Sequence, residues 1–305
     1  MGSFSKRVRG VAVAAVAGVG LTAMPSAAHA APTAVVAVSC NTPALIAAIT
    51  AANAATSQTL RLATGCTYDL TAAAQTGTRG PNGLPIITGN VTLVGRNTTI
   101  RRNAAALFRI VEVSAGAGLA LRGITLTGGD GGANTGGAIL NARGRVLLFR
   151  SLVFGNTADN GGGISNDSGS LRLVSSTVRN NTTGIGGGGG GIYNDGGMLV
   201  KFSRVNSNRA NTDGGGIYNE LGGRAYMYRS DIVGNIAVSE GGGIYNGNGG
   251  YLRGDLVRVS FNGAASGGGH YNLGAPGSGA FTRSAVTQNN PNNCAPLGTV
   301  PGCTG

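Results

Sequence analysis

The chain has 305 residues, of which 57 are glycine, 41% are hydrophobic and none is tryptophan, and its formal net charge is +12. No Gly-X-Y triplet persists, which excludes collagen, and the regular apolar pattern argues against disorder. The basic excess suits acidic partners such as anionic polymers. No nucleic-acid-binding motif accompanies the charge, so we expect no nucleic-acid partner.

Residues 1–30 have the pattern of a secretory signal peptide. A basic start is followed by an apolar run of 11 residues from Val11 to Leu21, which is too short to span a bilayer. The sequence Ala-His-Ala at 28–30 predicts cleavage before Ala31, and Ser-Ala-Ala at 26–28 offers a second site. Removing the three basic residues of this segment lowers the net charge to +9. We expect a secreted protein, extracellular or associated with the cell wall, with no membrane span.

The four cysteines fit an exported protein. Cys40 and Cys66 bracket the first segment after the signal, and Cys294 and Cys303 bracket the last. Of the three possible connectivities we predict the pairing between neighbours. The spacings are not those of zinc ligands, so we expect no metal on these cysteines.

Residues 31–57 are predicted to form a loose leader, over residues 31–39, and then a helix. Thr42 can cap this helix and Pro43 suits its first turn. Leu45, Ile46 and Ile49 give it one apolar stripe. Because an exposed strand edge recruits other chains, we expect this helix to cover the first edge of the fold that follows.

Residues 58–135 are predicted to be irregular first coils, with a polar, turn-rich excursion over residues 71–83. The expected strands are Thr59–Leu62, Thr67–Leu70, Val91–Val94, Thr98–Arg101, Leu107–Val113 and Leu119–Leu126.

Residues 136–290 contain a repeat, Gly-Gly-Gly-Ile-Tyr-Asn, that occurs six times with small changes. The closing asparagines, which are 25, 28, 25, 27 and 26 residues apart, are Asn141, Asn166, Asn194, Asn219, Asn246 and Asn272. A fixed period of this size is typical of a solenoid. In the same region a valine or isoleucine stands three residues before an asparagine; the pairs are Val153–Asn156, Val178–Asn181, Val205–Asn208, Ile232–Asn235, Val259–Asn262 and Val286–Asn289.

Three short strands per coil of this length predict a parallel β-helix. Four rows of side chains are expected to point inward: Ile139, Ile164, Ile192, Ile217, Ile244 and His270; Val146, Leu171, Met198, Ala225 and Leu252; Leu148, Leu173, Val200, Met227 and Phe281; and the valine or isoleucine row given above. The asparagine rows are predicted to be ladders of hydrogen-bonded amides. Residues 291–305 are expected to close the far end as a disulfide-linked cap.

The Gly-Gly-Ala-Ile at 136–139 and the recurring Val-x-x-Asn resemble the repeat pair of the chlamydial polymorphic outer-membrane proteins. The front of the chain is similar to secreted bacterial right-handed parallel β-helix proteins, in which a cysteine precedes an Ala-rich helix, here Cys40 and Leu45 to Ala54. The resemblance implies an all-β, right-handed parallel β-helix of three strands per coil, with repeats of 25–28 residues and an N-terminal capping helix. It implies a pectate-lyase-like shape without implying pectate lyase activity.

Four tyrosines occupy one position in consecutive coils: Tyr193, Tyr218, Tyr245 and Tyr271. We call them the Tyr stripe. They are expected to point outward and could stack against a sugar chain or another flat ligand. The alternative is that the rings pack against one another on an outer sheet, where tyrosine is a favoured residue.

Acidic residues bracket the same strand, and Asp213 and Glu240 are one coil apart. Paired carboxyls roughly 5–9.5 Å apart serve glycosidases, so these two are the candidate catalytic residues. Clustered carboxylates also suit calcium, so a calcium site is a further hypothesis for these acids. The alternative is that they are solvated residues of glycine-rich turns with no ligand. His270, the only histidine after the signal, is expected to be buried rather than a catalytic base.

Nearly all basic residues are arginines, and eight of them, which we call the Arg face, belong to the second and third strands: Arg145, Arg172, Arg204, Arg224, Arg229, Arg253, Arg258 and Arg283. A face of this kind could hold uronate chains or anionic wall polymers. The leading hypothesis is an exported, non-catalytic protein that binds polysaccharide or a cell-envelope polymer through the Tyr stripe and the Arg face. The alternatives are a polysaccharide lyase or glycosidase, and a purely structural or adhesive surface protein. The oligomeric state is not predicted.

Overall fold

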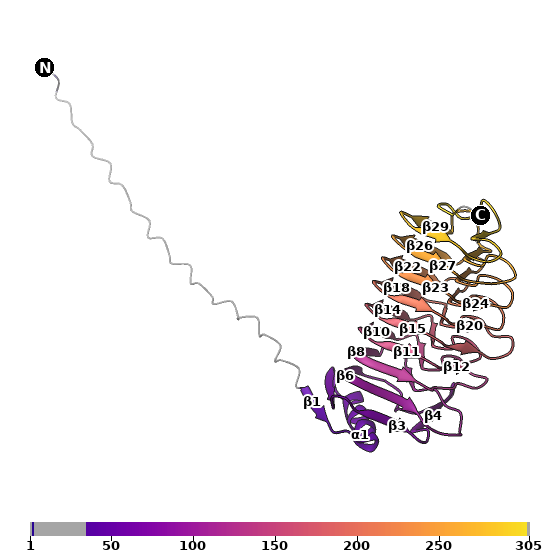
Figure 1. Ribbon diagram of the computed structural model, residues 1–305. Helices are drawn as coiled ribbons and strands as arrows, with labels where there is room; N and C mark the ends of the chain where they lie inside the picture. Colours follow the sequence, from indigo (N-terminus) through magenta and orange to yellow (C-terminus); the bar gives the residue numbers. More distant parts are fainter. Residues whose placement is uncertain (1, 3–34, 304–305) are drawn as a thin grey trace. The chain divides into compact units, whose positions relative to one another are not determined.

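Parallel strands of successive coils lie side by side from Val35 to the C-terminal end of the described chain (Figure 1). The computed structural model describes Gly2 and residues 35–303, so the predicted signal peptide and its cleavage site lie outside the described residues. The described coils form a parallel β-helix of about 10 turns, as the repeat predicts.

The Gly-Gly-Gly-Ile-Tyr-Asn repeats form one sheet, which we call the narrow sheet. Its strands pair in parallel, and each Ile, Tyr and Asn lies beside its counterpart in the next coil. The strands are β7 (Val111–Val113), β9 (Ile139–Ala142), β13 (Ile164–Asp167), β17 (Ile192–Asn194), β21 (Ile217–Asn219), β25 (Ile244–Asn246), β28 (His270–Asn272) and β31 (Cys294–Ala295).

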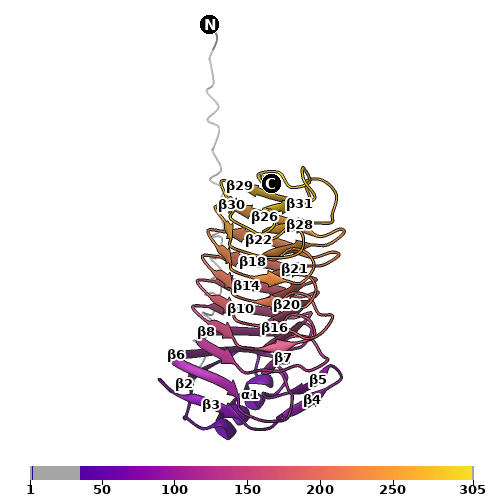
Figure 2. The same ribbon diagram turned by 45° about the vertical axis from the view of Figure 1, so that its right-hand side comes forward.

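The second and third strands of each coil belong together to the large sheet, which has two columns (Figure 1). Figure 2 shows the first column together with strands β7, β21, β28 and β31 of the narrow sheet. The first column contains β1 (Val35–Val38), β2 (Gln58–Leu62), β6 (Asn90–Arg102), β8 (Gly118–Thr127), β10 (Arg145–Phe149), β14 (Ser170–Val174), β18 (Gly197–Lys201), β22 (Arg224–Tyr228), β26 (Tyr251–Asp255) and β29 (Gly279–Thr282). The second contains β3 (Thr67–Leu70), β11 (Leu152–Phe154), β15 (Thr177–Arg179), β19 (Arg204–Asn206), β23 (Asp231–Val233), β27 (Arg258–Ser260) and β30 (Ala285–Thr287), and the long strands β6 and β8 extend into it.

The coils differ from the expected three strands by a fourth, two-residue strand. These strands pair in parallel as a small sheet of β12 (Thr157–Ala158), β16 (Thr182–Thr183), β20 (Arg209–Ala210) and β24 (Ile236–Ala237). The excursion expected over residues 71–83 contains an antiparallel hairpin of β4 (Gln75–Gly77) and β5 (Gly80–Asn82).

The start of the described chain differs from the expected loose leader, because Val35–Val38 form strand β1, which pairs in parallel with β2. Helix α1 (Thr42–Asn53) follows and packs against β1, β2, β3 and β6. Its cap is Asn41, one residue before the expected Thr42, and the Asn41 side chain accepts a hydrogen bond from the Ala44 N–H. Leu45 and Ile49 are fully buried, so α1 covers this end of the solenoid.

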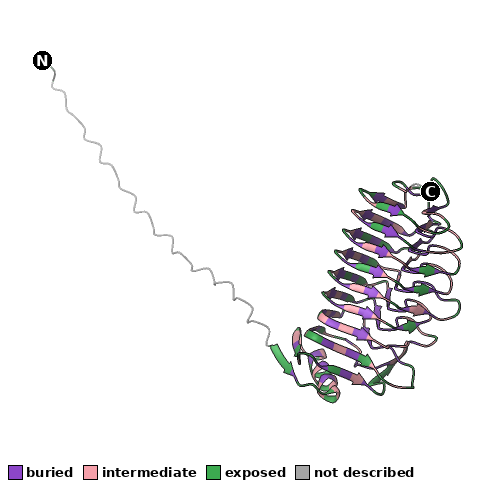
Figure 3. Ribbon diagram, in the orientation of Figure 1, coloured by how far each residue is buried: buried purple, intermediate pink, exposed green. Residues whose placement is uncertain are grey.

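All four predicted inward rows are buried, and Figure 3 shows buried and exposed positions alternating along the strands. The third row is interrupted at Gly254, which pairs with Met227 on one side and Phe281 on the other. A Cβ on Gly254 would lie 2.6 Å from the Phe281 ring, so the ring fills the space that the glycine leaves. Each buried aliphatic side chain contributes about 1.5–3 kcal/mol, which holds successive coils together.

Each of the three glycines of the repeat is required by the backbone, as the fourth copy shows. Gly214 has a φ of +64°, a backbone conformation that residues with a side chain rarely adopt. A Cβ on Gly215 would lie 2.4 Å from the Gly242 carbonyl oxygen, and one on Gly216 would lie 2.6 Å from that of Gly243. The first glycine therefore makes the turn, and the other two allow close approach of the next coil.

Both asparagine rows form the predicted amide ladders. In the narrow sheet, the Nδ2 atom of Asn194 donates to Oδ1 of Asn219 at 2.7 Å, and Asn219 donates to Asn246 at 2.7 Å. In the second ladder, Asn181 donates to Asn208 at 2.9 Å and Asn208 donates to Asn235 at 3.0 Å. The amides are buried, so the ladders satisfy polar groups that would otherwise be costly.

Disulfides join Cys40 to Cys66 and Cys294 to Cys303, which is the pairing between neighbours expected from the sequence. The first links the segment before α1 to the residue before β3. The second closes the loop that follows β31. Both bonds therefore lie at the ends of the stack.

Candidate functional site

The Tyr stripe lies on the outer face of the narrow sheet, one ring per coil. Successive ring centroids are 5.2, 4.6 and 5.7 Å apart, and all three pairs are stacked. Tyr218 and Tyr245 therefore have both ring faces covered by neighbouring rings, and Tyr245 is only 6% exposed. A sugar that approaches these two residues would meet ring edges rather than flat faces.

Carboxylates hold the phenol groups at both ends of the stripe. The Tyr193 hydroxyl donates to Oε2 of Glu220 at 2.7 Å. Burial raises the pKa of Tyr271, and a hydrogen bond with Glu240 acts in the same direction. Burial also raises the pKa of Tyr245 to about 12, with the Asp213 and Glu240 charges contributing. The phenols therefore stay protonated at neutral pH.

Asp213 and Glu240 lie in adjacent coils, as predicted, and Oδ1 of Asp213 accepts a hydrogen bond from the Glu240 backbone N–H at 2.9 Å. Burial raises the pKa of Asp213 above its ordinary value, and the Glu240 charge adds to this. The Asp213 carboxylate thus already has a backbone partner on one oxygen. The pair stands beside Tyr245 and Tyr271, and its role in catalysis stays a hypothesis.

His270 is fully buried in the first inward row, as expected. Neither ring nitrogen has a hydrogen-bond partner, and the ring meets Phe281 edge-on with centroids 5.5 Å apart. Burial lowers the pKa of His270 to about 3. The imidazole is therefore neutral and closed off from solvent.

The Arg face is not purely basic, because Asp231 and Asp255 lie among its arginines. Asp231 lies between Arg204 and Arg258, at 3.1 and 3.0 Å, and these two arginines lower its pKa against the opposing effect of burial. Asp255 forms an ion pair with Arg283. Both carboxylates are on the large sheet, so Arg204 and Arg258 of its second column share one negative charge and Arg283 pairs with another.

The first column of the large sheet and the turns that lead into it carry a row of hollows that crosses the strands. Two hollows, of about 460 and 310 Å³, lie on the strands, and a third, of about 620 Å³, lies mostly over the turns that precede β22, β26 and β29. The first two share Ser170 and Arg172, and the last two share Arg224 and Tyr226, so the hollows are neighbours in a row from β6 to β26. We call this row of hollows the groove. It runs along the stacking direction of the coils.

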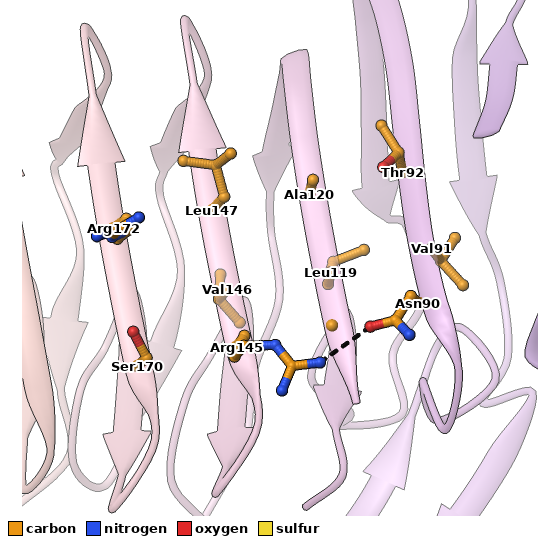
Figure 4. Close-up of a pocket in the computed structure, with 11 residues that line it drawn as sticks. Asn90, Val91, Thr92, Leu119, Ala120, Arg145, Val146, Leu147, Ser170 and Arg172 are labelled. Carbon is orange, nitrogen blue, oxygen red and sulfur yellow. Dashed lines mark hydrogen bonds between the residues drawn. The ribbon is translucent and has the colours of Figure 1, made fainter. Parts of the chain in front are cut away.

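Figure 4 shows the first hollow, where the Arg145 side chain reaches across β8. One guanidinium nitrogen donates to Oδ1 of Asn90 at 3.1 Å. The intervening residue is Gly118, where a Cβ would lie only 2.7 Å from that oxygen. The hydrogen bond to Asn90 therefore holds Arg145 along the floor of the hollow, and Gly118 leaves room for it because it has no side chain. Arg172 lies on the next strand, β14, toward the middle hollow.

The middle hollow lies between two exposed arginines without partners. Arg172 and Arg224 make no side-chain hydrogen bond, ion pair or ring contact with the rest of the described chain. Gly197 and Leu199 of β18 lie between them. Two guanidinium groups on either side of a small, partly apolar floor can hold an anionic group with paired hydrogen bonds.

Aromatic rings line the C-terminal half of the groove. Tyr226 is 45% exposed, and its ring centroid lies 5.7 Å from that of Tyr251. The Arg253 guanidinium lies over the Tyr251 ring at 4.3 Å and donates to the Gly277 carbonyl at 2.7 Å. This half therefore combines flat apolar surface with fixed positive charge.

The arginines of the groove can be placed from the sequence, but the groove itself cannot. Tyr226 and Tyr251 give no repeating signal because they stand in different rows, one beside Leu199 and the other beside Arg224. Gly118 and Gly197 are small residues at outward positions, and they hint at a hollow. Only the register of the strands shows that both lie in the same row of the first column, where they form part of the floor.

No three His, Cys, Asp or Glu side chains among residues 35–303 lie close enough together to hold a metal ion. Calcium therefore gains no set of carboxylate ligands within that part of the chain. No described helix is long and apolar enough to cross a membrane.

No model of a known protein family matches the chain, and no curated protein matches it. Among solved structures the chain is similar to the crystal structure of pectate lyase Pel9A, with a TM-score of 0.47 and 15% identity, over 86% of this chain and 78% of that one. At this identity the similarity concerns the fold alone. The resemblance of the repeats to the chlamydial proteins stays a prediction.

Proposed function

We propose that the protein binds a linear acidic polysaccharide, with uronate units, along the groove of the large sheet. The observation that carries the proposal is the middle hollow, where Arg172 and Arg224 present guanidinium groups that no other described residue engages. Arginine matches carboxylate geometry with paired hydrogen bonds. An extended polymer fits because the hollows lie in one row.

Sugar rings rather than simple anions are favoured by the tyrosines. Tyr226 and Tyr251 offer apolar ring surface beside the arginines, and such rings combine a large contact area with a polar tip. The Tyr stripe has its middle ring faces covered, so we place it second, as an edge contact on the narrow sheet. The proposed function therefore keeps the predicted ligand class and assigns it to the Arg face.

The test is titration of polygalacturonate into the wild type and the double variant Arg172→Gln/Arg224→Gln. Hydrogen bonds to charged groups contribute about 1.5–3 kcal/mol each, so we expect the variant to bind at least about tenfold more weakly. Arg96→Gln/Arg209→Gln removes two exposed arginines outside the groove and keeps the same net charge as the groove variant. Equal weakening in both variants would contradict the proposal, and so would absence of binding by the wild type.

A lyase or glycosidase that uses Asp213 and Glu240 is the alternative, favoured by the raised pKa of Asp213. A carboxyl that keeps its proton can act as a general acid. The screen is release of reducing ends and of unsaturated products from uronate and neutral glycans. Our proposal predicts no release; product formation that Asp213→Asn abolishes would establish the alternative.

A further inference from the structure

Another hollow, of about 250 Å³, lies at the corner where the first column of the large sheet turns into the second. We call it the corner hollow. It shares no lining residue with the three hollows of the groove. The buried residues Ser176 and Ser203 form its floor, and Oγ of Ser203 accepts a hydrogen bond from the Ser176 N–H at 3.0 Å. The rows on either side of these serines form two walls: Ser175, Phe202 and Arg229 on one side, and Thr177, Arg204 and Asp231 on the other.

Phe202 gives the first wall an apolar surface. It is 45% exposed although it lines the hollow. Its ring meets the Tyr228 ring edge-on with centroids 5.8 Å apart, and the Lys201 ammonium lies 5.1 Å from its centroid. Because these neighbours already hold the ring, it loses little conformational freedom when a ligand contacts it.

The second wall offers hydrogen-bond donors and acceptors together. Asp231 accepts one hydrogen bond on each carboxylate oxygen, from Arg204 at 3.1 Å and from Arg258 at 3.0 Å. Each oxygen therefore keeps a further lone pair, and the Arg204 guanidinium keeps further N–H donors. The Thr177 hydroxyl makes no hydrogen bond with the rest of residues 35–303 and can both donate and accept. Sugar hydroxyls need such mixed partners, whereas an anion would meet the Asp231 charge.

We infer that the corner hollow binds one neutral sugar unit, with the C–H groups of the sugar ring against Phe202 and its hydroxyls on Asp231, Arg204 and Thr177. The volume supports a single unit, since sites for larger ligands measure about 300–1,000 Å³. The inference does not depend on the proposed function, because the two sites have no residue in common. A protein with both sites holds an acidic polymer and a neutral glycan at the same time.

The experiment screens the full chain against hexasaccharides of glucose, mannose, galactose, xylose and N-acetylglucosamine by saturation-transfer NMR, with calorimetric titration of those that bind. We expect at least one to bind the wild type. Phe202→Asn removes the ring and suits the φ of +51° at this position, and it should weaken binding about tenfold. Thr177→Val keeps the shape of the side chain and removes its hydroxyl, and it should weaken binding about fivefold.

Phe261→Asn is the matched control. Phe261 is also exposed and has a φ of +57°, but it does not line the corner hollow, so its replacement should leave the affinity within a factor of two. The groove variant Arg172→Gln/Arg224→Gln should also leave it unchanged. Equal melting temperatures show that the variants are folded.

Three results would overturn the inference. Absence of binding by every hexasaccharide would do so and would leave the proposed function intact. Equal weakening by Phe202→Asn and Phe261→Asn, or loss of binding in Arg172→Gln/Arg224→Gln alone, would place the neutral sugar elsewhere. Displacement of the hexasaccharide by inorganic sulfate, with sodium chloride of the same ionic strength as the control, would identify the corner hollow as an anion site instead.

Discussion

Arg172 and Arg224 are set apart from most of the Arg face by the absence of a protein partner. Arg204 and Arg258 share the Asp231 carboxylate, and Arg283 pairs with Asp255. The sequence could place all these arginines on the same strands, since their outward positions follow from alternation. The sequence could not show which arginines pair with a carboxylate, because the paired residues belong to different coils and are 27 or 28 positions apart.

His270 leads to a prediction about pH. The ordinary pKa of 6.5 falls to about 3 in the folded chain, because the fully buried ring is desolvated. The unfolded chain therefore binds a proton that the folded chain excludes, and stability falls as pH decreases from 6.5 toward 3, by about 1.4 kcal/mol per pH unit. His270→Ile completes the isoleucine row and removes this loss.

The measurement is the melting temperature of wild type and His270→Ile between pH 7 and pH 4. We expect the variant to be more stable at pH 7, by about 1–3 kcal/mol, since it removes a buried polar group without partners. The gap should widen as pH falls below 6.5. A gap that stays constant or narrows over this range would show that the ring is not the buried neutral group described.

At the scale of elements, replacing an asparagine of a ladder is expected to lower stability by an amount that depends on its position in the ladder. Asn208 donates to Asn235 and to the Val178 carbonyl, and its Oδ1 atom accepts from the N–H and the amide of Asn181. Asn208→Ala leaves several buried groups unpaired, so we expect a loss of about 3 kcal/mol.

Asn289 provides the comparison for Asn208 because it lies near the end of the same ladder and is only partly buried. Asn289→Ala should cost less, since water can reach the groups it leaves unpaired. Chemical denaturation of both variants measures the difference. Equal costs would mean that the ladder contributes nothing beyond local turn formation.

Arg109 connects the β4–β5 hairpin to the first coils. It is 1% exposed, lies 3.2 Å from the Glu112 carboxylate and donates to the Arg79 backbone carbonyl within the hairpin turn. Burial lowers its pKa, and the Glu112 charge opposes that change. A lone arginine gives no periodic signal, which is why the sequence shows the excursion but not its anchor.

Arg109→Met should destabilise the chain by about 3–5 kcal/mol, because it leaves the buried Glu112 carboxylate without its counter-charge. The double variant Arg109→Met/Glu112→Leu should recover much of this loss. The denaturation midpoints of the two variants provide the test. A double variant that is less stable than the single one would contradict a charge-pair role.

The regular coils could be predicted well from the sequence because each of their features repeats. The buried rows, the ladders and the strand order all follow from a period of 25–28 residues. Strand β1, the fourth small strand and the Asn41 cap could not be predicted, because each is short or occurs where the repeat has not begun. The groove depends on side chains of different coils, which only the register brings together.

For the whole molecule, the proposed binding depends on the regular stacking of coils, which brings arginines from distant parts of the sequence onto one surface. A fixed spacing of about 4.8 Å per strand converts their sequence positions into a line of charge that an extended polyanion can follow. Binding of this kind should weaken as salt is added, because the exposed arginines are screened. The binding constant for polygalacturonate should fall steadily between 50 and 500 mM salt, and salt-independent binding would indicate an apolar site instead.

The most direct test of the central claim is a labelling footprint of the wild type with and without polygalacturonate. An arginine-specific reagent and a tyrosine-specific reagent report on both candidate surfaces, and mass spectrometry reads each residue. We predict protection of Arg172, Arg224 and Tyr226, with Arg209 and the Tyr stripe unchanged. Protection of Tyr193 and Tyr271 while Arg172 and Arg224 stay reactive would contradict binding in the groove and return the ligand to the narrow sheet.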